Sequence, residues 1–261
     1  MSILFRIPLR PDAGERGKNV SIVRSIDDLE TALLNAETDM ILQEFAGGDE
    51  ISVFYYRYPN EPSGKIFSIT EKRFPHVVGD GRSSIEELIL ADPRAVCLAE
   101  KYFEQNVGRL AKVPENGERV KIIDIGTHSR GAVFLDGGWM KTPALEQKIN
   151  EICRGFDGFY FGRFDIRTLS LDDLRRGENF KIIELNGVTS ESTNIYDPRY
   201  SLFDAYRILF AQWRIAFEIG AENIKLGAKV VGVFELLRLA FELENKPKIV
   251  ASPCNRPLTD H

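Results

Sequence analysis

The sequence predicts a mixed α+β protein, and three observations lead to that fold class. Segments with helix-capping residues and apolar positions every three or four residues recur along the chain. Between them lie short runs in which apolar and polar residues alternate, as in strands with one buried face. The composition, with 43% hydrophobic and 28% charged residues among 261, is that of a globular protein with one large domain or two small ones.

Helix signals mark six segments. Ser25, Asp92 and Thr142 are candidate N-caps, and Ser84 with Glu87 has the spacing of a capping box. The longest segment carries aromatic residues at helical spacing, which we interpret as core packing rather than as a cofactor contact. The residues expected in that packing are Leu202, Phe203, Tyr206, Leu209, Phe210, Trp213, Ala216 and Phe217. The expected helices span residues 25–36, 83–89, 92–103, 142–155, 197–220 and 230–243.

Strand signals occur in nine segments, of which the last two are close together. The polar connection SLDDLRRGEN between those two is short enough for an antiparallel hairpin. The expected strands span residues 2–7, 20–23, 40–45, 51–58, 65–70, 119–125, 132–134, 159–169 and 180–187.

The last two strands carry charge on one face. In FYFGRFDIRTL, alternation places Phe161, Arg163, Asp165 and Arg167 on one side. In FKIIELNG, it places Glu184 and Asn186 on one side together with Ile182, so that Asp165 could lie near both polar residues. An aspartate, a glutamate and an amide oxygen are the hard ligands that magnesium prefers, and Arg163 could hold a phosphoryl group. The alternative is a solvated ladder of ion pairs.

These two motifs resemble those of the ATP-grasp carboxylate–amine ligases, which include D-alanine–D-alanine ligase and cyanophycin synthetase. The resemblance implies that GRFDIR supplies Arg163 and the metal ligand Asp165, and that IIELNG supplies the metal ligands Glu184 and Asn186. It covers roughly residues 3–220 and implies an ATP-grasp fold, in which two α+β subdomains with mainly antiparallel sheets hold ATP between them. The implied domains are residues 1–46, the small subdomain; 47–220, the large subdomain with the metal site; and 221–261, a C-terminal helix and loose tail.

The stretch ILQEFAGGDEISV resembles the hinge that lies under adenine in this family. By position, Glu44 and the Phe45 backbone would contact adenine and Glu50 would contact the ribose. Taken by itself, the stretch is a hairpin with a turn at Gly47 and Gly48.

The stretch LRPDAGERGKNV resembles the glycine-rich loop that closes over the triphosphate. Gly14, Arg16 and Gly17 would contact phosphate, and Arg10 stands where the family has a lysine, which changes reach and geometry. The alternative is a surface turn with incidental basic residues. Further candidate anion contacts, for which simple solvation is the alternative, are Lys72, Arg73, His128 and Arg130.

The activity that the resemblance implies is ATP-dependent ligation. A carboxylate would be activated by ATP to an acylphosphate and then attacked by an amine, with magnesium, or manganese in its place, as the cofactor and Arg163 and Arg130 as catalytic residues. Two alternatives stay open: a truncated, inactive ATP-binding module, and a kinase of the same fold. Family members carry a further N-terminal lobe, which is missing here. We therefore expect that the chain is a fragment of a longer protein, that its start is misplaced, or that a partner supplies the lobe. A homo-oligomer is a separate alternative among the expected partners.

The composition and charge of the chain argue against several classes of partner and site. The net charge of −5 argues against a broad nucleic-acid surface. The most apolar stretch, residues 230–243, is interrupted by Glu235 and Arg238 and is too short for a membrane span. The three cysteines are far apart in the sequence, which argues against a disulfide scaffold and fits a reducing cytoplasm. The three histidines are equally scattered, which argues against a zinc site.

Overall fold

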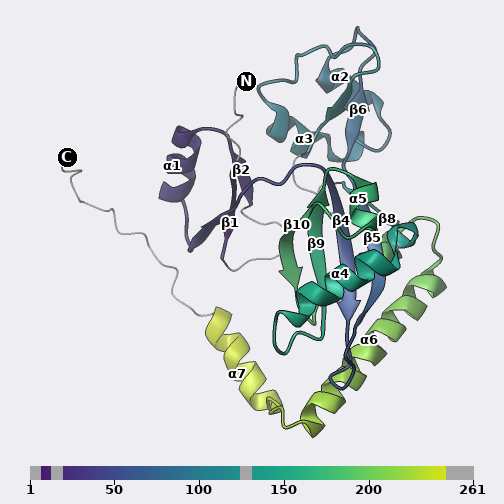
Figure 1. The fold of residues 1–261 in the computed structure, drawn as a ribbon. Coiled ribbons are helices and arrows are strands. Elements are labelled where there is room, and N and C mark those ends of the chain that lie inside the picture. Colours follow the sequence, from purple (N-terminus) through teal and green to yellow (C-terminus); the bar gives the residue numbers. More distant parts are fainter. Residues whose placement is uncertain (1–6, 13–19, 124–130, 245–261) are drawn as a thin grey trace, which may run out of the picture. The chain divides into compact units, whose positions relative to one another are not determined.

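The structure is a computed structural model that describes residues 7–12, 20–123 and 131–244. The chain forms two compact units, drawn in one ribbon in Figure 1. The small unit comprises Met1–Phe45 with Lys229–His261, and the large unit comprises Ala46–Ala228. In the described ranges, none of the helices has the length and apolar character needed to cross a membrane.

The small unit contains a three-stranded antiparallel sheet. Strand β1 (Ile7–Pro11) lies between β2 (Ser21–Val23) and β3 (Met40–Leu42). Helix α1 (Ile26–Leu34) begins at the predicted cap, because the Ser25 hydroxyl accepts a hydrogen bond from the Asp28 amide. The other helix of this unit is α7 (Val233–Glu244).

The large unit is built on a five-stranded sheet in the order β10-β9-β4-β5-β8, and every neighbouring pair is antiparallel. The predicted α+β class with antiparallel sheets is therefore confirmed, as is the hairpin of the last two strands. The strands are β4 (Asp49–Tyr56), β5 (Lys65–Arg73), β8 (Val133–Asp136), β9 (Phe161–Thr168) and β10 (Phe180–Asn186). The hairpin connection contains a short helix, α5 (Leu171–Arg175), which the sequence did not predict.

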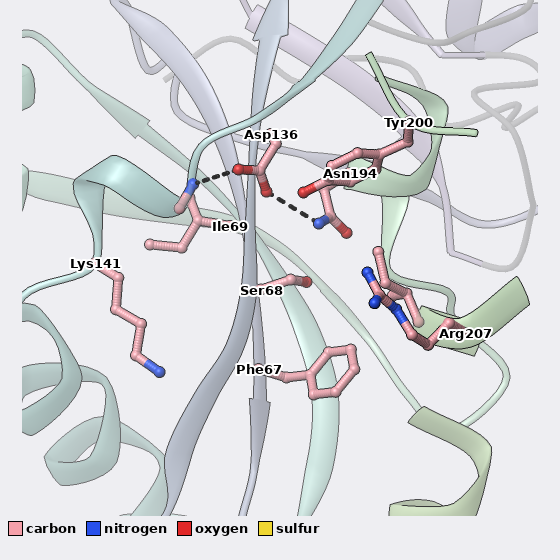
Figure 2. Close-up of a pocket in the computed structure, with 10 residues that line it drawn as sticks. Phe67, Ser68, Ile69, Asp136, Lys141, Asn194, Tyr200 and Arg207 are labelled. Carbon is pink, nitrogen blue, oxygen red and sulfur yellow. Dashed lines mark hydrogen bonds between the residues drawn. The ribbon is translucent and has the colours of Figure 1, made fainter. Parts of the chain in front are cut away.

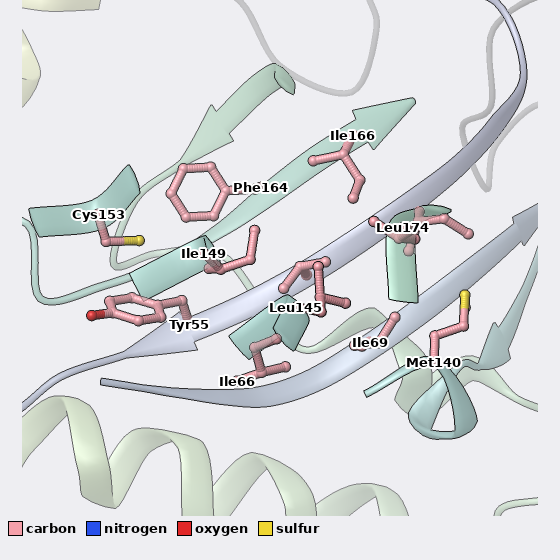
Figure 3. Close-up of a cluster of buried hydrophobic side chains, with 12 residues drawn as sticks. Tyr55, Ile66, Ile69, Met140, Leu145, Ile149, Cys153, Phe164, Ile166 and Leu174 are labelled. Atoms are coloured by element: carbon pink, nitrogen blue, oxygen red, sulfur yellow. The ribbon is translucent and has the colours of Figure 1, made fainter. Parts of the chain in front are cut away.

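Helix α4 (Pro143–Arg154) covers one face of this sheet and creates the main core, shown in Figure 3. The helix begins as predicted, since the Thr142 hydroxyl accepts a hydrogen bond from the Leu145 amide and Pro143 occupies the first turn. Strand β4 is buried on both faces, so the residues on its second face must also find partners. The core consists of Ile51, Val53, Tyr55, Ile66, Ile69, Met140, Leu145, Ile149, Cys153, Phe164, Ile166 and Leu174.

A second core forms around a two-stranded sheet of β6 (His76–Val78) and β7 (Arg119–Lys121). Helix α2 (Ile85–Ala91) carries the predicted capping box of Ser84 and Glu87. The helix predicted to begin at Asp92 is wrong in its start: the Asp92 carboxylate accepts hydrogen bonds from the Arg94 and Ala95 amides in a turn. This is the bonding of an N-cap, but the residues directly after it form a turn, and the 3-10 turn η1 (Val96–Leu98) and then α3 (Ala99–Asn106) follow.

The remaining elements of the large unit are η3 (Gly138–Met140), η4 (Thr193–Tyr196) and the long helix α6 (Leu202–Lys225). Helix α6 packs against the sheet through Ile219 and the half-buried Ile215 and Ala216. The predicted core packing of its aromatic residues is wrong, because five aromatic side chains of α6 are exposed on its other side. The helix is apolar on more than one side, so periodicity alone could not choose the face that packs. The exposed aromatic residues are Phe203, Tyr206, Phe210, Trp213 and Phe217.

Candidate functional site

A charged face covers the side of the large sheet that turns away from α4. Cross-strand partners share a face, and here Glu50 of β4 is opposite both Lys72 of β5 and Arg167 of β9. In the next row, Ser52 of β4 is opposite Asp165 of β9. The predicted alternation of β9 is confirmed, since Phe164 and Ile166 point into the core. We call this set, with Arg163, the charged face: Glu50, Ser52, Lys72, Arg163, Asp165 and Arg167.

Lys72 joins the two carboxylates of the charged face. Its ammonium lies 2.8 Å from the Glu50 carboxylate and 3.0 Å from Oδ2 of Asp165, and all three side chains are buried. Arg167 completes the pairing of Glu50 at 2.5 Å. The Ser52 hydroxyl donates to Oδ1 of Asp165 at 2.6 Å. Buried charges persist only when they are paired and hydrogen-bonded, and this network meets that requirement.

The electrostatics of the charged face keep both Lys72 and Asp165 ionised. Burial alone would raise the pKa of Asp165, but Lys72, Arg163 and the Ser52 hydrogen bond together hold it below its ordinary value. Burial alone would lower the pKa of Lys72, but Asp165 and Glu50 together raise it. Arg163 contributes from 3.4 Å, the distance between its Nε and Oδ1 of Asp165.

Strand β10 adds Glu184 and Asn186 to the same face. Glu184 is directly opposite Asp165, and Asn186 is directly opposite Arg163. A bulge lies between Ile182 and Glu184, and it turns Ile182 toward the core face, opposite Ile166. The prediction that Ile182 shares the face of Glu184 is therefore wrong, because one inserted residue interrupts the alternation, whereas the juxtaposition of Glu184 and Asn186 with β9 is present.

The donor chemistry of these residues fits a hard divalent cation. Two carboxylates and an amide lie on adjacent strands, and the amide of Asn186 would supply its Oδ1 as a ligand. Nowhere in the described ranges do three His, Cys, Asp or Glu side chains gather in a metal-binding group, so a cation here would depend on the amide of Asn186 as well. Both oxygens of Asp165 are already engaged, Oδ2 by Lys72 and Oδ1 by the Ser52 hydroxyl, so Asp165 would be shared between these partners and the cation.

The other predicted site residues are distributed over both units. Glu50 belongs to the charged face, and its two oxygens are engaged by Lys72 and Arg167. Arg10 lies in β1 and Glu44 and Phe45 follow β3, all in the small unit. Five predicted residues lie outside the part of the chain that the structure describes, namely Gly14, Arg16, Gly17, His128 and Arg130.

Sequence reasoning missed the central role of Lys72 and the contribution of Ser52. Lys72 was expected as an anion contact in a loop, but β5 extends to Arg73 and places Lys72 inside the sheet. The signal was present in ITEKR, where Thr70 and Lys72 alternate with Ile69 and Glu71. Glutamate and lysine are depleted in strands, so the propensities of Glu71 and Lys72 favoured an end of the strand at Thr70.

A cavity of about 320 Å³ lies beside the sheet in the large unit, and Figure 2 shows its lining. Asn194 donates from Nδ2 to Oδ1 of Asp136 at 3.1 Å, which leaves its own buried Oδ1 without a partner. Burial and the Asp136 carboxylate raise the pKa of Tyr200. Lys141 and Arg207 also line the cavity, and both are paired, Lys141 with Glu146 at 3.2 Å and Arg207 with Asp204 at 3.0 Å.

Comparison with known proteins gives similarities at the level of structure. No family model and no curated sequence match the chain. The structure is similar to that of a bifunctional glutathione synthetase from Pasteurella multocida, with a TM-score of 0.40 and 15% identity. The match covers 81% of this chain and 31% of the length of that protein. At this TM-score and identity, the similarity assigns no family and no activity, and the functional argument rests on the residues of the site.

Proposed function

We propose that this chain is an ATP- and magnesium-dependent ligase of the ATP-grasp type, which joins a carboxylate to an amine through an acylphosphate. The observation that carries the proposal is the alignment of Asp165, Glu184 and Asn186 on one face of the sheet, beside the cations Lys72 and Arg163. Hard oxygen ligands next to paired cations form a site suited to phosphate groups and their counter-ion.

In this proposal, Asp165, Glu184 and Asn186 hold magnesium, or manganese in its place. When bound, the metal neutralises phosphate charge. Arg163 is positioned by a hydrogen bond from Nη1 to the Glu191 carbonyl oxygen at 2.9 Å, so its guanidinium is held at the charged face, where phosphoryl charge would develop. Lys72 holds Asp165 ionised and therefore ready to act as a ligand.

The same proposal assigns nucleotide contacts to residues chosen by the family resemblance. Glu44 and the Phe45 backbone would contact adenine, and Glu50 would contact ribose after giving up part of its pairing with Lys72 or Arg167. The phosphate contacts would be Arg10, Gly14, Arg16 and Gly17, and Arg130 would assist the reaction together with Arg163.

We assign the small-molecule substrate to the cavity of Figure 2. The unpartnered Oδ1 of Asn194 and the Asp136 carboxylate would accept hydrogen bonds from an ammonium group. Lys141 and Arg207 would bind a carboxylate after giving up part of their pairing with Glu146 and Asp204. A small molecule that carries both groups fits these walls, which agrees with a ligase that joins a carboxylate to an amine.

The metal assignment is tested by titrating the protein with a non-hydrolysable ATP analogue in the presence and absence of magnesium. Asp165→Asn and Glu184→Gln should each weaken magnesium-dependent binding by about tenfold or more, since each removes a charged ligand. Asp172→Asn is the matched control, because that aspartate is 81% exposed on α5 and should bind as wild type does. Wild-type affinity in both site variants would remove the metal assignment.

A second candidate function is an inactive ATP-binding module. It is favoured by the pairing of Asp165 with Lys72, which already neutralises the carboxylate that a metal would need. The two functions are separated by measuring ADP release with panels of amino acids and amines. Substrate-dependent multiple turnovers establish the ligase, whereas magnesium-dependent nucleotide binding without turnover across the panel establishes the module.

A further inference from the structure

Helix α6 presents an aromatic face that is exposed among the described residues of the large unit. Phe203, Phe210 and Phe217 are 86%, 73% and 78% exposed, and Tyr206 and Trp213 are 53% and 51% exposed. Helix α6 runs along the sheet, and its opposite side packs against it through Ile219 (Figure 1). Large contiguous apolar surfaces are rare on monomers and mark interaction sites. The aromatic face of α6 is defined by these five residues.

The spacing of the aromatic face is that of a helix-pairing seam. Phe203, Phe210 and Phe217 are seven residues apart, and Tyr206 and Trp213 follow the first two by three residues. This is the a/d pattern by which one helix packs against another along its length. An isolated surface aromatic needs no partner, but five at this spacing form a continuous stripe over the helix.

The size of the stripe matches what a stable interface requires. With each aromatic side chain taken as about 200 Å², the exposed fractions give roughly 700 Å² per copy. A standard protein interface buries about 800 Å² on each partner. Leu202 and Ile224, which are 70% and 53% exposed at the two ends of α6, extend the apolar surface toward that value.

We propose that the aromatic face of α6 is the interface of a homodimer, in which it packs against the same face of a second copy of this chain. The length of the stripe argues for this occupant. Helix α6 has 24 residues and is therefore about 36 Å long. Helix α7 of the same chain has 12 residues, about 18 Å, whereas the apolar surface from Leu202 to Ile224 is about 33 Å long, so α7 would leave nearly half of that surface uncovered. A second α6 has the matching length and the matching pattern.

The charges beside the stripe permit this pairing. Arg207 pairs with Asp204 at 3.0 Å, and Arg214 pairs with Glu218 at 2.8 Å, each within α6. The flanks of the aromatic face are thus locally neutral, and two identical copies can approach without repulsion between like charges. A two-fold interface of this kind uses the same patch on both subunits and closes after two copies.

The experiment measures the mass of the full chain by sedimentation velocity between about 1 and about 100 μM, a range that covers ordinary dimer affinities. The wild type should be a dimer, and Phe210→Glu should raise the dimer dissociation constant by about 100-fold or more, since the change places a charge in the centre of the seam. Phe217→Glu is a second variant with the same expectation. Circular dichroism and thermal unfolding confirm that each variant is folded.

Two matched controls locate the interface. Phe156→Glu alters an exposed phenylalanine elsewhere in the large unit, and Phe234→Glu alters one on α7. Both should remain dimeric if the aromatic face of α6 is the interface. A monomeric wild type over the whole range overturns the proposal and leaves α7 or a different protein as the cover. A dimer that survives both α6 variants, or that only Phe234→Glu dissociates, also overturns it. The outcome does not depend on the proposed ligase activity.

Discussion

Removal of the Lys72 ammonium is the sharpest test of the charged face. Lys72→Met keeps the length of the side chain but leaves Glu50 and Asp165 without their shared cation. Breaking a buried ion pair from one side costs about 3–5 kcal/mol, because the remaining charge stays desolvated. In the variant, Glu50 still has its ion pair with Arg167, and Asp165 still accepts the hydrogen bond from Ser52. We therefore expect a decrease in the free energy of unfolding near the lower end of that range, about 3 kcal/mol.

The assay is urea denaturation of the wild type, Lys72→Met and a control, Arg73→Met, at pH 7. Arg73 is the next residue of the same strand and pairs with Glu71 at 2.7 Å, but its side chain is 62% exposed. An exposed pair of this kind contributes about 0–1 kcal/mol. Equal losses in the two variants would refute the claim that burial makes the Lys72 pairs essential.

The pH dependence of the same variants gives an independent check. Because the folded pKa of Asp165 lies below its unfolded value, its pairing adds stability above about pH 4 that is lost as the pH falls through the folded pKa. The folded pKa of Lys72 is raised, so the stability that its pairing adds is present at neutral pH and is lost only at alkaline pH, as the pH rises through that pKa. The difference between wild type and Lys72→Met should thus be largest near neutral pH and shrink below about pH 4.

Three further predictions concern the frame around the site. Gly48→Ala should destabilise the large unit by about 2 kcal/mol or more, because Gly48 has φ 90° and an added Cβ would lie 2.0 Å from the Thr168 carbonyl oxygen; urea denaturation checks this, with Gly187→Ala as the unhindered control. Thr142→Ala should cost about 1 kcal/mol through loss of the α4 cap, and Thr142→Ser should restore most of it in the same assay. The Cys153 thiol, whose pKa burial raises to about 12, should resist alkylation at pH 8 in the folded protein while the exposed Cys97 reacts, and peptide mass mapping distinguishes them; equal labelling would contradict the buried position.

The sequence alone predicted the local features that depend on neighbouring residues. The caps at Ser25, Ser84 and Thr142 were readable because a short polar side chain satisfies an amide two or three residues away. Alternation in β9 likewise predicted that Arg163 and Asp165 share a face, since side chains alternate along any strand. The sequence of β9 alone therefore predicted two members of the charged face, Arg163 and Asp165.

Only the tertiary structure decided which residues complete that face and which side of a helix is buried. Lys72 joins Glu50 and Asp165 because β5, β4 and β9 are aligned in register, and register is set by long-range pairing. The bulge that separates Ile182 from Glu184 has no clear mark in the sequence. In α6, several sides are apolar, so the choice of Ile219 over Phe210 depended on the sheet against which the helix packs. Periodicity gives the faces of an element, whereas the partner that each face meets is a property of the whole fold.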